Sequence, residues 1–109
     1  MVASELILLE CDRALIRAET SGEIAAAQSA ALRAELARAA SFWTLLRIAD
    51  EVLDRARRPF PIEPLRSLDA LHLGTLLVAR SIFADLALLS LDDRIRENAV
   101  ALGFQVAKL

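Results

Sequence analysis

The feature that most constrains the fold is the alternation of helix and strand patterns in the second half of the chain. Residues 68–80 are apolar nearly all round, as in a buried helix, and the continuous apolar run at 86–90 ends in a polar turn, as a buried parallel strand does. A helix is expected over 93–102, Gly103 then provides a stop, and a last short strand is expected over 104–107. This order predicts an α/β domain with a parallel sheet and flanking helices.

The first half of the chain is interpreted as two helices followed by a short strand. Ser4 can cap a helix that runs from about residue 5 to residue 19, and a second, alanine-rich helix is expected over 23–39. The aromatic and apolar run at 42–46 predicts a strand. The chain of 109 residues has no internal repeats, so we predict a single domain over residues 1–109.

All three prolines lie within residues 58–64, which must therefore form an extended loop. We expect a short helix capped by Asp50 before this loop, and Ser67 is expected to cap the helix that follows it. The chain has a net charge of -2, so any contact with RNA must come from a local basic patch. Four arginines flank the loop and either contact phosphates or form a solvated face: Arg55, Arg57, Arg58 and Arg66.

Three acidic residues are candidates for a metal site. Asp92 follows the strand at 86–90, and ligands collect at the C-terminal ends of strands in open parallel sheets. Asp69 lies in the first turn of the helix at 68–80, and Glu10 lies mid-helix among apolar neighbours, where a carboxylate needs a partner or a cation. Clustered carboxylates repel one another unless a divalent cation holds them. Mg²⁺ or Mn²⁺ favours such oxygen ligands and could activate a water for attack on a phosphodiester.

Each candidate also has a purely structural interpretation. Asp92 is a good N-cap residue, and Asp69 complements a helix dipole. Glu10 can pair with Arg13, three residues further along the helix, or reach solvent. His72 is interpreted as a core or interface histidine in preference to a metal ligand.

The lone cysteine indicates the compartment. Cys11 is the single cysteine of the chain, so an intrachain disulfide is impossible and a reducing cytoplasm is the expected setting. Its apolar neighbours predict a buried and inert thiol, since a reactive thiol requires a basic or polar pocket. No run of about 18 apolar residues is present, so neither a membrane span nor secretion is expected.

Taken together, residues 3–17, 65–73 and 88–103 resemble the PIN-domain family, specifically the VapC-type toxins of bacterial and archaeal toxin–antitoxin pairs. The last two stretches are the more specific ones in order and spacing. The resemblance implies a PIN-like α/β fold and a Mg²⁺- or Mn²⁺-dependent endoribonuclease. It also implies an RNA substrate, a cognate antitoxin that silences the enzyme, and a homodimer.

The resemblance also assigns roles to individual residues. Glu10, Asp69 and Asp92 match the family's acidic positions, which makes them the expected metal-binding and catalytic residues. Ser90 matches the small hydroxyl residue that precedes the last of these positions, and Asp93 is a peripheral acid. Ser90 and Asp93 are therefore expected as accessory residues.

The chain departs from the family at its N-terminus. The family opens with an apolar strand that ends in an aspartate, and no such run precedes Glu10; residues 1–3 look like the tail of the family's second strand. The missing strand is central in the family's sheet, so its loss should expose two strand edges and remove one carboxylate from the metal site. We therefore expect a truncated or mis-started VapC-like protein with weak or no activity.

A natural truncation and a degraded toxin both stay open as interpretations of this departure. The first would pair its exposed strand edges with another copy of the chain, and the second would have no activity. The alternative function is a non-catalytic PIN-like module for dimerisation or antitoxin binding, with the apolar helix at 68–80 as its interface.

Overall fold

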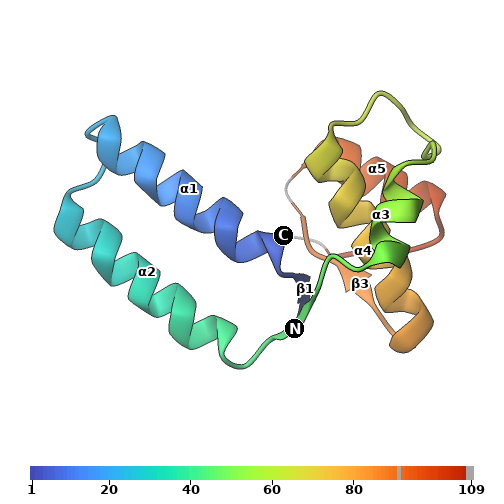
Figure 1. Cartoon of the computed structure of the whole chain (residues 1–109), viewed down its shortest axis with the longest axis horizontal. Helices are drawn as coiled ribbons and strands as arrows, with labels where there is room; N and C mark the ends of the chain where they lie inside the picture. The colour runs from blue at the N-terminus through green and yellow to red at the C-terminus, as the bar shows by residue number, and fades with distance from the viewer. Residues whose placement is uncertain (91, 108–109) are drawn as a thin grey trace. The chain divides into compact units, whose positions relative to one another are not determined.

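A computed structural model describes residues 1–90 and 92–107 and divides the chain into two compact units, Met1–Arg47 and Ile48–Leu109 (Figure 1). The elements in chain order are β1 (Val2–Ser4), α1 (Leu6–Thr20), α2 (Ala26–Ala40), β2 (Thr44–Leu46), α3 (Asp50–Ala56), α4 (Ser67–Ile82), β3 (Ala87–Leu88), α5 (Asp93–Ala101) and β4 (Gln105–Val106). The described residues thus combine five helices with short strands, which confirms a mixed α/β architecture. The finer prediction of a single PIN-like domain stays a prediction.

The first unit is a helical hairpin attached to a short parallel sheet. Strands β1 and β2 pair in parallel, with Val2 opposite Thr44 and Ser4 opposite Leu46. Helices α1 and α2 run antiparallel in Figure 1, and they are joined by a turn in which Gly22 adopts a φ of 81°. That value is accessible to glycine at little cost, so the predicted stop of α1 at this point is confirmed.

The beginning of α1 differs slightly from the expectation. Ser4 belongs to β1, and the helix begins at Leu6. The Ser4 hydroxyl nevertheless accepts a hydrogen bond from the Leu6 amide at 3.3 Å, so it satisfies one of the amides that the first turn leaves without an intrahelical partner. The N-cap position itself belongs to Glu5, so the prediction of Ser4 as the N-cap residue was wrong by one position.

The core of the second unit forms where α4 packs on α3 and on the proline loop (residues 58–64). Phe60, Ala70 and Leu73 are buried together, with Leu65 and Ile95 packed against them. Among the described residues, Leu73 is fully buried with an exposed fraction of 0%. This cluster anchors the loop at Phe60 and holds α4 in place.

A glycine allows α3 and α4 to approach closely. A Cβ atom added at Gly74 of α4 would lie 3.0 Å from the carbonyl oxygen of Val52 in α3. Val52 is itself 1% exposed, so α3 has little room to give way. The packing thus favours glycine at position 74, although a glycine within a helix carries a cost in backbone entropy.

The sheet of the second unit contains the two strands that the sequence predicts at 86–90 and 104–107. In the structure they are shorter, and they pair in parallel with Ala87 opposite Gln105 and Leu88 opposite Val106. Both sheets contain two strands, so each described strand has one edge without a strand partner. Within the described part of the chain, no helix has the length and apolar character needed to cross a membrane.

Candidate functional site

Asp92 follows β3 in the chain and caps α5. One carboxylate oxygen of Asp92 accepts a hydrogen bond from the Ile95 amide at 3.1 Å, and the Asp92 amide donates to the Ser90 hydroxyl at 3.1 Å. The Arg96 guanidinium of α5 donates to the Ser90 carbonyl at 2.8 Å. Asp92 and Asp93 are both exposed. The structure therefore confirms the N-cap role of Asp92, and among residues 1–90 and 92–107 its other carboxylate oxygen has no hydrogen-bond partner.

Asp69 is the third residue of α4, and its side chain is half-buried at the N-terminal end of that helix. Its carboxylate accepts a hydrogen bond from the Arg66 amide at 3.3 Å. Ser67, which the sequence predicts as the cap, is instead the first residue of α4, and the N-cap position belongs to Arg66. That prediction was wrong because a carboxylate three residues into a helix can reach back to the free amide of the N-cap residue.

The proline loop leads into α4 and is hydrogen-bonded to α5. Asn98 of α5 accepts a hydrogen bond from the Ile62 amide and donates one to the Ile62 carbonyl, each at 2.9 Å. One turn earlier on α5, the Arg94 guanidinium donates to the Pro64 carbonyl at 3.2 Å. These bonds hold the N-terminal half of α5 against the loop that leads directly into α4, and Figure 1 shows the beginnings of the two helices at this loop.

Asp69 and Asp92 consequently lie in neighbouring parts of the second unit. Asp69 bonds the residue that ends the loop, and Asp92 lies two residues before Arg94, which bonds the same end of the loop. No group of three or more histidine, cysteine or acidic side chains with a geometry suited to a metal ion occurs among residues 1–90 and 92–107. The oxygen chemistry of the two aspartates nevertheless fits Mg²⁺ or Mn²⁺.

Glu10, the third predicted ligand, belongs to the first unit, where it is half-buried in α1. Its negative charge acts on the neighbouring residue Cys11. Partial burial raises the pKa of the Cys11 thiol above its ordinary value, and the charges of Glu10 and Asp12 raise it further. Glu10 belongs to the first unit, whereas Asp69 and Asp92 belong to the second. The predicted proximity of these residues therefore stays a prediction.

Two further sequence predictions concern single residues. Cys11 is half-buried, so the prediction of a fully buried thiol was wrong, and the prediction that the thiol is inert stays a prediction that its raised pKa favours. His72 is half-buried in α4, and its predicted core or interface role is compatible with that placement. Leu91, which lies in the stretch that resembles the family, is outside the described residues.

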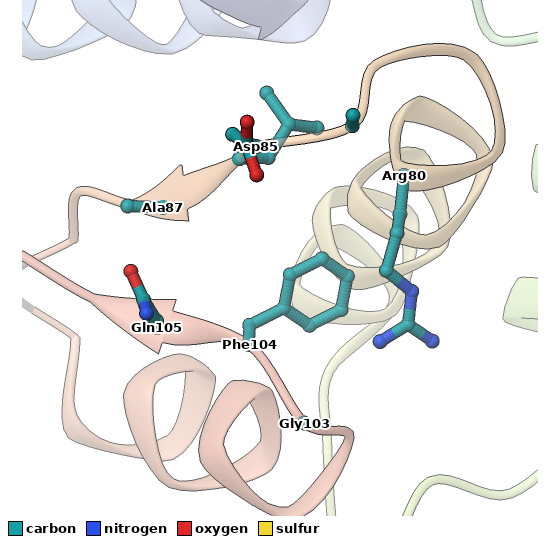
Figure 2. Close-up of a pocket in the computed structure, with 8 residues that line it drawn as sticks. Arg80, Asp85, Ala87, Gly103, Phe104 and Gln105 are labelled. Carbon is teal, nitrogen blue, oxygen red and sulfur yellow. The ribbon is translucent and has the colours of Figure 1, made fainter.

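A cavity of about 240 Å³ lies in the second unit, beside the N-terminal end of β3 (Figure 2). The Arg80 guanidinium lies 4.3 Å from the centre of the Phe104 ring and donates to the Leu102 carbonyl at 2.7 Å. Asp85 and Gln105 also line the cavity. Asp92 follows the opposite end of β3, so this cavity is separate from the predicted acidic site.

The sequence interpretation did not anticipate this cavity. Arg80 and Phe104 are 24 positions apart, and their contact depends on how α4 packs against the segment before β4. The Arg80 guanidinium is a hydrogen-bond partner for the Leu102 carbonyl at the C-terminal end of α5, and it covers the buried ring of Phe104. Arg80 thus has a structural role.

Comparison with known proteins gives no match: no protein-family model, no curated protein and no solved structure matches the chain.

Proposed function

We propose that the protein is a VapC-like endoribonuclease that depends on Mg²⁺ or Mn²⁺ and forms a toxin–antitoxin pair with a cognate antitoxin. The observation that carries the proposal is the position of Asp69 in the first turn of α4 and of Asp92 at the N-cap of α5, two helices that begin at the same loop. The parallel pairing of β3 and β4 supports it, because Asp92 then lies beyond the C-terminal end of a parallel strand.

Asp69 and Asp92 would hold the metal ion, which would supply a water activated for attack on the RNA backbone. The protein itself orients the two aspartates: the Ile95 amide fixes one oxygen of Asp92, and the Arg66 amide fixes one oxygen of Asp69. A carboxylate that is oriented in this way loses less entropy when its other oxygen takes up a ligand. Ser90 and Asp93 would act as accessory residues, since the Ser90 hydroxyl holds the Asp92 amide.

The test is RNA cleavage by the 109-residue chain with Mn²⁺, with and without a chelator. The informative variants are Asp92→Asn and Asp69→Asn, because asparagine retains an oxygen for the helix amide but lacks the charge that a metal ion requires. Asp54→Asn is the matched control, since Asp54 is an exposed aspartate of α3.

In line with a truncated site, we expect weak cleavage that the chelator abolishes, that Asp92→Asn and Asp69→Asn abolish, and that Asp54→Asn leaves unchanged. Cleavage that persists with the chelator, or that all three variants support equally, would refute the assignment.

The second candidate is a non-catalytic module that forms homodimers or binds the antitoxin. The apolar surface of α4 favours it, since Leu68 and Ile82 at the two ends of that helix are 47% and 61% exposed. Light scattering of the chain at micromolar concentration tests it: a dimer that Leu68→Glu and Ile82→Glu disrupt, together with no cleavage, would favour this candidate. A monomer would count against it.

A further inference from the structure

We infer that the proline loop is a rigid, basic contact surface for the phosphate backbone of RNA, formed by Arg57, Arg58 and Arg66. The inference rests on the proposed function for one point, namely that the substrate is RNA. Residues 55–66 contain four arginines and one glutamate, a net charge of +3 in a chain whose net charge is -2. The remainder of the chain therefore carries a net charge of -5, so this segment is the strongest local attraction for a polyanion.

The fold fixes the loop by hydrogen bonds from several side chains. Both carboxylate oxygens of Glu63 accept hydrogen bonds from backbone amides, one from Phe60 at 2.9 Å and one from Leu65 at 2.8 Å. The buried side chain of Asn98 holds Ile62 through both its amide and its carbonyl. The glutamate is thus engaged with the backbone, and the loop has one well-defined conformation in which to present its arginines.

The arginines in and beside the loop divide into two groups. Arg55 donates to the carbonyls of Arg58 and Pro59, at 3.3 and 3.2 Å, and its guanidinium lies 4.1 Å from the centre of the Phe60 ring. Arg55 therefore has a structural role. Arg57, Arg58 and Arg66 are exposed, and their side chains take part in no hydrogen bond or ion pair within the described part of the chain.

Exposed guanidinium groups on a fixed loop suit an extended phosphate backbone. An arginine can bind a phosphate with two parallel hydrogen bonds, and a rigid loop avoids the entropic cost of ordering the backbone on binding. Arg66 precedes α4 and its amide bonds Asp69, so a strand held by this loop would pass beside the predicted acidic site. The loop would thus position RNA for Asp69 and Asp92.

The test measures binding of a short fluorescein-labelled single-stranded RNA by anisotropy, in chelator, over a series of salt concentrations. The triple variant Arg57→Gln, Arg58→Gln, Arg66→Gln removes the three loop arginines. The control variant Arg13→Gln, Arg17→Gln, Arg38→Gln removes three exposed arginines of α1 and α2 and lowers the net charge equally. Circular dichroism checks that both variants fold.

Three phosphate contacts on a single strand predict that affinity falls about 20-fold between about 50 and 200 mM salt. We expect this dependence in the natural sequence and in the control variant, and its loss in the loop variant. Equal weakening in the two variants, or no salt-dependent binding by the natural sequence, would overturn the inference. Tighter binding of a DNA strand of the same sequence would overturn the assignment to RNA.

The chelator separates this result from the cleavage test. Loop-dependent binding without cleavage by any variant in Mn²⁺ would leave the contact surface standing and refute the nuclease. Cleavage that depends on Asp92 but not on the loop arginines would do the reverse.

Discussion

Replacing Asn98 with alanine should selectively destabilise the second unit. Asn98 is 0% exposed, and its side chain makes two hydrogen bonds to Ile62, both at 2.9 Å. The substitution leaves the Ile62 amide and carbonyl without these partners. At about 1 kcal/mol for each lost bond, and with a small cavity in addition, the free energy of unfolding should fall by about 2–3 kcal/mol.

The assay is thermal unfolding followed by circular dichroism, combined with hydrogen exchange at the Ile62 amide. A loss of this size should lower the unfolding midpoint by about 10 °C or more, and it should increase the exchange rate at Ile62. Glu97→Ala is the matched control, since Glu97 is the exposed neighbour of Asn98 on α5. If Asn98→Ala and Glu97→Ala lowered the midpoint equally, or if exchange at Ile62 did not change, the reasoning about this loop would be wrong.

Two further predictions concern the first unit. Ser29→Ala should raise the free energy of unfolding by about 1 kcal/mol. Ser29 is 2% exposed, its buried hydroxyl has no hydrogen-bond partner among the described residues, and alanine is the better helix former. Lower stability on chemical denaturation would contradict this. Cys11 should react with iodoacetamide more slowly than free cysteine at neutral pH, because burial and the charges of Glu10 and Asp12 raise its pKa and leave less thiolate. A rate equal to that of free cysteine would refute that argument.

Several elements could be predicted from the sequence because their signals are local. Gly103 adopts a φ of 89° directly after α5, and Asp92 caps the beginning of that helix, as the sequence indicates. The two parallel strands near the C-terminus follow from their apolar runs and the helix between them. The wrong prediction of Ser67 as a cap shows the limit of such local arguments. The helix begins one residue earlier than expected, and the Asp69 carboxylate accepts the hydrogen bond from the amide of the N-cap residue Arg66.

The sequence by itself therefore determined the order of helices and strands, the stops at glycine and the acidic residues that the site proposal uses. The tertiary structure decided which of these residues lie near one another. Ile62 and Asn98 are 36 positions apart, and their pairing draws α5 to the loop before α4. Such a contact depends on the burial of Asn98 and Phe60 within one core, and the packing of a core is a property of the whole unit that no short segment of the sequence carries.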